Sequence, residues 1–166
     1  MIAALSFAAA IGVGLPRAFP GPCPTSRARY ELRGDPAISA GFKLYSSRPK
    51  DVASDVYMFV HSRRTGSTYW FSLDWGSARI ISVYPIADPE PQRTGQEPHS
   101  PMMADIQMSL WLTDGRLNFL GSELEGRDPA PKYFLLPELE NNMWYGAVPR
   151  EPVGTAFFVL KACANP

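Results

Sequence analysis

The sequence predicts an all-β, mostly antiparallel fold, either a β-sandwich or a flattened barrel, with at most one or two short helices. The 17 prolines and 13 glycines lie mostly between apolar runs, as turn residues do between short strands. Aromatic residues make up 12% of the chain and are concentrated within those runs. Apolar and polar residues alternate there, which is typical of half-buried strands. Helical spacing is scarce by comparison.

Ten segments have this strand-like pattern, and each is bounded by turn residues. They are residues 29–33, 42–46, 56–62, 68–75, 79–84, 106–113, 116–120, 132–136, 143–147 and 155–162. Only residues 49–55 and 137–142 are predicted to form short helices. At 166 residues, the chain is expected to form one domain with a proper core.

The strongest turn signal is Asp114-Gly115, which lies between two apolar runs. A two-residue type I′ turn requires positive φ at both central positions, and Asp-Gly tolerates this. The resulting hairpin register would pair Thr113 with Arg116. Its core face would carry Leu110, Leu112, Leu117 and Phe119, and its other face Trp111 and Asn118.

A second hairpin is predicted to join residues 56–62 to 68–75 through a tip that contains residues 63–66. A loop of two or four residues and a loop of three residues bury opposite faces of this hairpin. We favour the former because it leaves His61, Trp70 and Asp74 on the wetter side. The buried residues are then Met58, Val60, Tyr69, Phe71 and Leu73.

Residues 1–18 are predicted to be a signal peptide that is cleaved. Positions 2–11 contain Ser6 as their one polar residue, and small residues that suit a cleavage site follow. Pro16 and Arg17 interrupt the apolar run before it reaches the length of about 20 residues that a transmembrane helix needs. The mature chain, residues 19–166, is then a single β domain that is secreted or periplasmic. The alternative is an N-terminal helix or strand buried in the fold.

The two cysteines, Cys23 and Cys163, lie near opposite ends of the chain. In an exported protein they are predicted to form a disulfide. In the chain-entropy model, a bridge across so long a loop stabilises the fold by about 5 kcal/mol at most. The alternative is a pair of buried free thiols in a cytosolic protein.

The charge of the chain excludes two classes of partner. Its 16 basic and 16 acidic residues give a formal net charge of zero, which provides no bulk attraction to nucleic acid or to an anionic membrane. We therefore expect no nucleic-acid partner and no membrane span after cleavage. Phosphate-binding loops, zinc motifs and dinucleotide fingerprints are also absent from the sequence, so neither a metal nor a cofactor is expected.

Residues 85–104 are predicted to be a Pro-rich insertion, with five prolines between positions 85 and 101. A structureless loop of this length is uncommon in a compact domain. We expect it to be a lid or an arm that binds a partner.

Three tryptophans, Trp70, Trp111 and Trp144, are candidates for a flat aromatic surface. Such a surface can stack on sugar rings or anchor a protein partner; the alternative is that loops cover it and make it a second core. Arg63 and Arg64, at the predicted hairpin tip, can bind an anion or a partner's carboxylate, or be simply solvated.

His61 and Asp74 form the one His and carboxylate pair that the predicted strands can bring onto one face. A carboxylate can orient an imidazole as a general base, but no serine lies in a nucleophile elbow. The sequence thus predicts a non-enzymatic, exported binding or interaction module of the cell envelope or exterior, with a protein or glycan partner. The alternatives are a small secreted hydrolase that uses His61 and Asp74 and a carbohydrate-binding module that uses the aromatic face.

Overall fold

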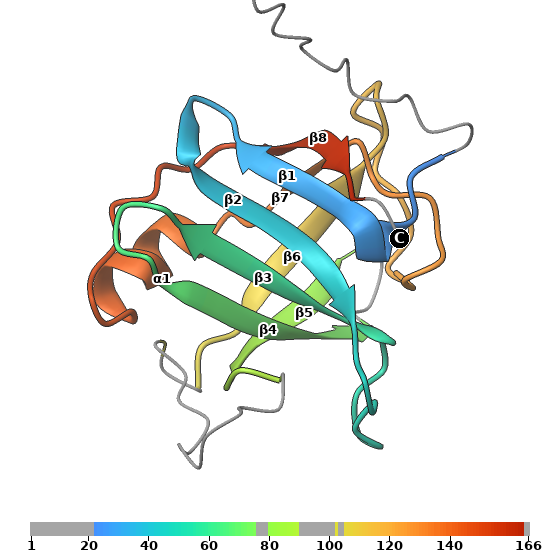
Figure 1. Cartoon of the computed structure of the whole chain (residues 1–166), viewed down its shortest axis with the longest axis horizontal. Coiled ribbons are helices and arrows are strands. Elements are labelled where there is room, and N and C mark those ends of the chain that lie inside the picture. The colour runs from blue at the N-terminus through green and yellow to red at the C-terminus, as the bar shows by residue number, and fades with distance from the viewer. Residues whose placement is uncertain (1–21, 76–79, 90–101, 103–104, 165–166) are drawn as a thin grey trace, which may run out of the picture.

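The computed structural model of the chain describes residues 22–75, 80–89, 102 and 105–164. Within these residues, eight antiparallel strands form a closed barrel in which every strand pairs with its neighbour in sequence and the last pairs with the first (Figure 1). The strands are β1 (Ala28–Leu32), β2 (Asp35–Leu44), β3 (Val56–Ser62), β4 (Thr68–Trp75), β5 (Ile81–Ile86), β6 (Met108–Thr113), β7 (Tyr133–Leu135) and β8 (Phe158–Cys163). A 3-10 turn, η1 (Thr25–Arg27), precedes β1, and the helix α1 (Leu139–Tyr145) separates β7 from β8.

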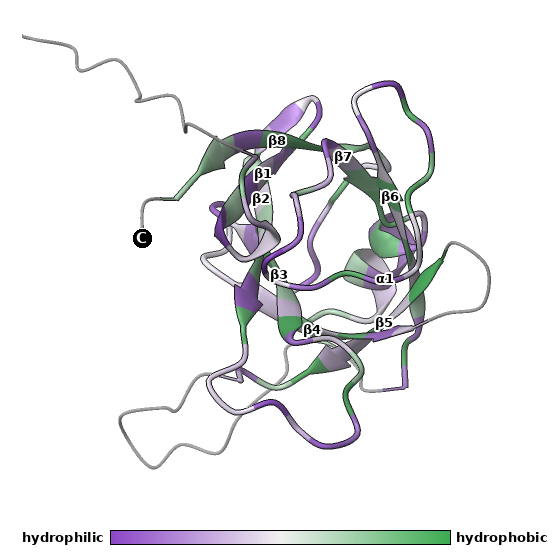
Figure 2. Cartoon of the chain, turned by 90° about the vertical axis from the view of Figure 1, so that its right-hand side faces the viewer, coloured by the Kyte–Doolittle hydropathy of each residue, from purple (hydrophilic) through white to green (hydrophobic). Residues whose placement is uncertain are grey.

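The all-β antiparallel prediction is confirmed, and of the two predicted architectures the structure has the barrel. Figure 2 looks along the barrel and shows the strands arranged in a ring. The predicted signal peptide, residues 1–18, lies outside the described residues, as does most of the predicted Pro-rich insertion, at positions 90–101, 103 and 104. The insertion begins within a strand, because Pro85 and Ile86 belong to β5.

The interior of the barrel is filled by aromatic side chains. Tyr30, Phe42, Phe134 and Phe158 are at most 1% exposed, and the rings of Phe134 and Phe158 stack with their centroids 4.6 Å apart. Tyr30 and Phe42 contact this pair edge-on, and the Tyr30 hydroxyl donates a hydrogen bond to the carbonyl of Pro131. Eight strands enclose about the space that side chains can fill. The described interior is therefore a packed core, not a ligand cavity.

The hairpin of β3 and β4 matches its prediction in both boundaries and register. The Ser62 amide donates to the Ser67 carbonyl at 3.0 Å, which leaves residues 63–66 as a four-residue loop. His61 lies opposite Thr68. The five residues predicted to face inward are completely buried: Met58, Val60, Tyr69, Phe71 and Leu73.

The predicted type I′ turn at Asp114-Gly115 is wrong, and so is the strand at residues 116–120. The Asp114 carboxylate accepts hydrogen bonds from the amides of Arg116 and Asn118, at 2.7 and 2.9 Å, and this holds a longer loop in place of a two-residue turn. The Asn118 side chain also donates to this carboxylate. The Asn118 side-chain bond, followed by the bonds from the backbone amides, lowers the pKa of Asp114. Thr113 therefore pairs with Phe119 instead of Arg116.

As a result, the two residues predicted to complete the core face of this hairpin are on the surface. Leu117 is 55% exposed and Phe119 is 45% exposed, and the positive φ expected at Asp114 and Gly115 occurs instead at Leu117, with a φ of 65°. Leu110 and Leu112 are buried as predicted. The strand that pairs with β6 on this side is β7, which comes later in the chain.

The predicted strand at residues 143–147 is also wrong, because α1 continues through most of it. Leu139 and Met143 are one turn apart and both are buried, so the helix covers the core with one face. The helix predicted at residues 137–142 is therefore correct in kind, but it starts and ends too early, since α1 runs from Leu139 to Tyr145. Residues 49–55 form turns and bends, not a helix.

The barrel has two distinct ends. At the disulfide end, β1 begins and β8 ends, and Cys23 is bonded to Cys163 with their Cα atoms 5.8 Å apart, as predicted. At the opposite end, which we call the α1 end, the β1–β2 and β3–β4 turns meet α1 and the segment that follows it (Figure 1). The candidate functional site lies at the α1 end.

Candidate binding groove beside helix α1

Helix α1 presents two different faces. Leu139 and Met143 point into the core, whereas Glu140, Asn141 and Trp144 are exposed on the outer side. Trp144 lies four residues after Glu140 and three after Asn141, so all three lie on one side of the helix. The short helix is thus anchored by its inner face and leaves an outer face of mixed aromatic and polar character.

A groove of about 550 Å³ runs between this outer face and the segment that leads to β8. Its volume lies within the range of small-ligand and peptide sites. The groove combines two aromatic rings and two prolines with a carboxylate, an amide and a hydroxyl. Its lining residues are Pro137, Glu140, Asn141, Trp144, Tyr145, Pro152, Val153, Gly154 and Thr155.

Large apolar side chains are exposed beside the groove. Trp144 is 42% exposed, Tyr145 71% and Val148 77%. The Arg150 guanidinium lies 5.8 Å from the centre of the Trp144 ring but does not line the groove. We call these four residues the α1 surface. All four lie within seven positions of the chain, and three of them, Trp144, Tyr145 and Arg150, are of the residue types that most often dominate protein interfaces.

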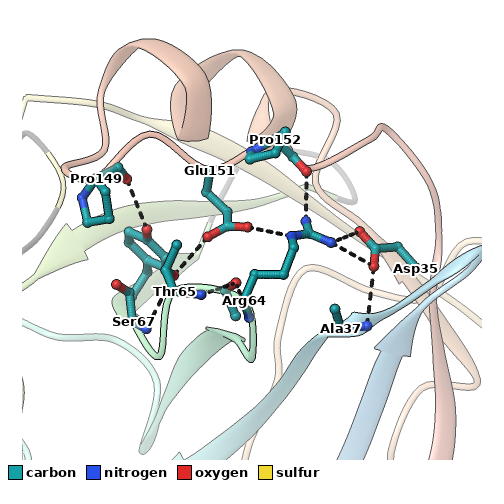
Figure 3. A network of polar contacts seen from close by, with 10 residues as sticks. Asp35, Ala37, Arg64, Thr65, Ser67, Pro149, Glu151 and Pro152 are labelled. Carbon is teal, nitrogen blue, oxygen red and sulfur yellow. Dashed lines mark hydrogen bonds and ion pairs between the residues drawn. The ribbon is translucent and has the colours of Figure 1, made fainter.

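A network of polar contacts holds the backbone beneath the α1 surface (Figure 3). Arg64 donates from Nε to Glu151 Oε1 at 3.0 Å and from Nη1 to Asp35 Oδ2 at 2.8 Å. Thr65 donates from its hydroxyl to the other oxygen of Glu151 at 2.8 Å. The Glu151 side chain is completely buried, so Arg64 neutralises a carboxylate that water does not reach. We call Arg64, Asp35, Glu151 and Thr65 the clasp.

The clasp also fixes the main chain next to the groove. Arg64 Nη2 donates to the Pro152 carbonyl at 2.8 Å, and the Glu151 amide donates to the Met143 carbonyl at 3.0 Å. The hydrogen bond to Asp35, followed by that to Glu151, raises the pKa of Arg64, which therefore stays charged at any physiological pH. The α1 surface is thus displayed by a backbone fixed on both sides.

Tyr69 adds a further support from inside the barrel wall. Its ring is buried, and its hydroxyl donates to the Pro149 carbonyl at 3.4 Å, as Figure 3 shows. Burial raises the pKa of Tyr69, so it remains a neutral donor. Within the groove, Glu140 Oε2 accepts hydrogen bonds from the amide and hydroxyl of Thr155, which link the helix to the segment before β8. Both walls of the groove are therefore held in place.

The predicted cationic tip is engaged by the chain itself. Arg64 belongs to the clasp, and Arg63 donates from its side chain to the Pro36 carbonyl. Arg64 does bind carboxylates, as the sequence interpretation allowed, but they are those of Asp35 and Glu151 in the same chain. The tip serves to join three loops at the α1 end.

The three predicted tryptophans do not form one surface, because they lie on β4, β6 and α1. Trp70 is opposite Ile86, whereas Trp111 follows Leu110, which is opposite Ile81. Ile81 and Ile86 are five residues apart on β5, so Trp70 and Trp111 are separated by about 17 Å along the strand direction. Trp144 is the one of the three that lines the groove.

Trp70 instead belongs to an aromatic cluster on the outer face of β2, β3 and β4. Its ring contacts those of Tyr57 and Phe59, and Tyr57 in turn contacts Tyr45. Lys43 lies 5.4 Å from the centre of the Trp70 ring. Since Tyr57 is only 2% exposed, this cluster is closer to a second core than to an open binding surface.

His61 and Asp74 lie on the same outer face but are not brought together. His61 is opposite Thr68, to which its Nδ1 is hydrogen-bonded at 3.0 Å. Asp74 is six residues further along β4, about 20 Å away, and accepts a hydrogen bond from the Trp75 amide. The arrangement provides no contact through which this carboxylate could orient the imidazole.

Among the described residues, no group of three or more His, Cys, Asp or Glu side chains is arranged to hold a metal ion. No helix in the same residues has the length and apolar character needed to cross a membrane. In comparisons with known proteins, no family model, curated protein or solved structure matches this chain. Function is therefore inferred from the geometry of the α1 surface and its groove.

Sequence reasoning missed Val148 of the α1 surface, Glu151 of the clasp and Pro152 of the groove. The available signal was the spacing of Leu139 and Met143, which predicts a helix whose outer face is Glu140 and Trp144. The position of Glu151 had no local signal, since its partner Arg64 is 87 residues away.

Proposed function

We propose that this protein is an exported, non-enzymatic interaction module that binds a protein partner through the α1 surface and its groove. The observation that carries the proposal is the exposure of Trp144, Tyr145 and Val148 in one short segment. Contiguous exposed apolar side chains are uncommon on monomeric proteins and mark interaction sites.

The rigid support of this segment favours binding of a partner over a merely disordered loop. Association is opposed by the entropy lost when loops become ordered, and preorganisation lowers that cost. Here the buried Glu151 and the Tyr69 hydroxyl hold the backbone on either side of Arg150. Trp, Tyr and Arg, the residue types most enriched in interface hot spots, are then presented in a fixed arrangement.

Export is proposed from two features that agree. The disulfide between Cys23 and Cys163 is consistent with an oxidising, extracytoplasmic location. The apolar N-terminal segment, with small residues before position 18, has the pattern of a signal peptide. A periplasmic or secreted protein would meet its partner in the cell envelope or outside the cell.

A capture experiment with matched variants tests the proposal. The mature protein is immobilised, and envelope and extracellular fractions of the source cells are passed over it. The triple variant Trp144→Ala, Tyr145→Ala and Val148→Ala is compared with Leu44→Ser, which alters another exposed apolar residue. We expect a partner that the wild type and Leu44→Ser retain and that the triple variant loses, with all proteins folded by circular dichroism.

Loss of the same partner from both variants, or its retention by both, would contradict the proposed surface. A glycan array probed with the same three proteins provides the second arm. Binding to an oligosaccharide that the triple variant alone loses would replace the protein partner with a sugar, using Glu140 and Asn141 of the groove as hydrogen-bonding groups.

A further inference from the structure

A second groove, of about 440 Å³, lies on the outer face of β7 and β8, and none of its lining residues belongs to the α1 surface. Its lining is apolar and aromatic in the middle and cationic on the rim. Among the described residues that line it, none is acidic. They are Arg33, Gly115, Leu117, Tyr133, Phe157, Val159 and Lys161.

The two cations lie at opposite ends of this groove. The Arg33 amide donates to the Phe157 carbonyl at 2.9 Å, so Arg33 sits beside the start of β8. Lys161 is four residues further along the strand, about 13 Å away. Between them, Val159 and its cross-strand neighbour Tyr133 form the apolar floor. The order along the groove is therefore cation, apolar surface, cation.

Both cations are available to a ligand. Arg33 and Lys161 are exposed, and within the described part of the chain neither side chain has a hydrogen bond or an ion pair. Glu31 is opposite Val159 on the same face of the sheet but does not line the groove. Lys132 lies close to Gly115 on the other rim. The balance of charge around the groove is positive.

Two irregularities of the backbone coincide at this groove. The pairing of β1 with β8 shifts between Arg29 and Tyr30, whose partners are Ala162 and Leu160, so Lys161 is the extra residue of a bulge. Bulges re-aim a side chain and are common near binding sites. Leu117 on the opposite wall has a φ of 65°, a strained conformation for leucine that occurs more often at functional sites than elsewhere.

From this geometry we infer that the groove binds an extended segment of a protein partner that carries acidic residues four positions apart with an apolar residue midway. In an extended chain, residues i, i+2 and i+4 face the same way and span about 13 Å. This spacing matches Phe157, Val159 and Lys161, which all line the groove; Phe157 lies immediately before β8 and the other two lie within it. The two acidic side chains pair with Arg33 and Lys161, and the apolar one lies on Tyr133 and Val159.

A peptide titration followed by NMR tests this site. The probe is acetyl-Thr-Glu-Thr-Leu-Thr-Glu-Thr-amide, added to the ¹⁵N-labelled mature protein at low salt. We expect saturable shifts at Tyr133, Val159 and Lys161, with a Kd on the order of 0.1–1 mM, since exposed ion pairs are weak. Arg33→Gln and Lys161→Gln should each raise the Kd about two- to fivefold. Lys50→Gln, an exposed lysine elsewhere, should leave it unchanged.

Three controls can overturn the inference. Equal binding of the peptide with both glutamates replaced by glutamine would remove the acidic requirement. Shifts centred on Trp144 and Tyr145 would move the peptide to the α1 surface, and would leave the second groove without this role. Binding of dodecanoate at Tyr133 and Val159, without binding of the peptide, would identify the groove as a site for a single-headed amphiphile and contradict the proposed occupant.

Discussion

The two ends of this barrel are closed by different chemistry. At the disulfide end, a covalent bond joins Cys23 to Cys163 across 140 positions of sequence. At the α1 end, the clasp joins three loops through Arg64, which bonds to both Asp35 and Glu151. The disulfide does not depend on charge. The clasp depends on the ion pair between the buried Glu151 carboxylate and Arg64.

This difference bears on where function is located. A disulfide acts mainly by restricting the unfolded chain, and here it ties the segment before β1 to the end of β8. The clasp acts in the folded state and fixes the backbone under the α1 surface. The end that carries the exposed Trp144 and Tyr145 is thus the end whose geometry is set by side-chain contacts.

Removal of the disulfide should produce the largest effect. The double variant Cys23→Ser and Cys163→Ser is expected to lose about 3–5 kcal/mol of unfolding free energy, because the unfolded chain regains the entropy of a long loop. Urea unfolding monitored by tryptophan fluorescence measures this. A reducing agent should produce a similar loss in the wild type and none in the double variant. A loss below about 1 kcal/mol would mean that the clasp end carries the closure.

Breaking the clasp should have the next largest effect. Arg64→Met is expected to cost about 2–3 kcal/mol, because Glu151 remains buried without its cation. The cost is kept below that of a fully buried pair because Arg64 is 36% exposed. Adding Glu151→Met to this variant should recover part of the loss, since both charges are then absent. Additive losses in this double-mutant cycle would argue against coupling between the two residues.

Alkaline pH should act on the disulfide end. Tyr45 follows β2 in that region, and burial, aided by the nearby Asp51, raises its pKa to about 12. Since the folded state holds this proton more tightly than the unfolded state, stability is complete below pH 10 and falls as the pH rises toward 12. Tyr45→Phe should reduce the slope of unfolding free energy against pH in this window. An unchanged slope would mean that the pH dependence comes from other buried tyrosines, such as Tyr30, whose pKa is also raised by burial.

The smallest effect is expected at Leu117, in the loop between β6 and β7. Leu117→Gly should stabilise the protein by about 0.5 kcal/mol, because relief of the strain at positive φ exceeds the extra freedom that glycine gives the unfolded chain. Leu117→Ala keeps the strain and should give no gain. Thermal unfolding of the two variants side by side measures the difference, and equal melting temperatures would contradict the strain.

The sequence was sufficient where a local pattern and a turn agreed. The hairpin of β3 and β4 was predicted in full, because, of the two faces that could be buried, the one with Met58 and Val60 has the aliphatic residues and leaves His61 on the wetter side. The disulfide between Cys23 and Cys163 was predicted from two features: the chain has two cysteines, and its N-terminal segment has the pattern of an exported protein. The barrel itself could not be separated from a sandwich, since closure depends on β1 meeting β8, a pairing that no neighbouring residues encode.

The failures lie where a single side chain overrides local propensity. Asp114 binds the amides of Arg116 and Asn118 and so lengthens a turn that Asp-Gly would otherwise make tight. Trp144 and Tyr145 favour strands on average, but the burial of Leu139 and Met143 makes their segment helical. The clasp was missed because Arg64 and Glu151 are far apart in sequence and both types are ordinarily solvated.

The order of the strands has a consequence for how this chain reaches its native state. Seven of the eight strand pairings join segments adjacent in sequence, and the pairing of β1 with β8 alone spans the whole domain. Neighbouring hairpins can therefore form as the polypeptide emerges, at little cost in loop entropy. Cys163 sits at the very end of β8, opposite Ala28, so oxidation at that position would report that the final strand has docked and the ring is complete.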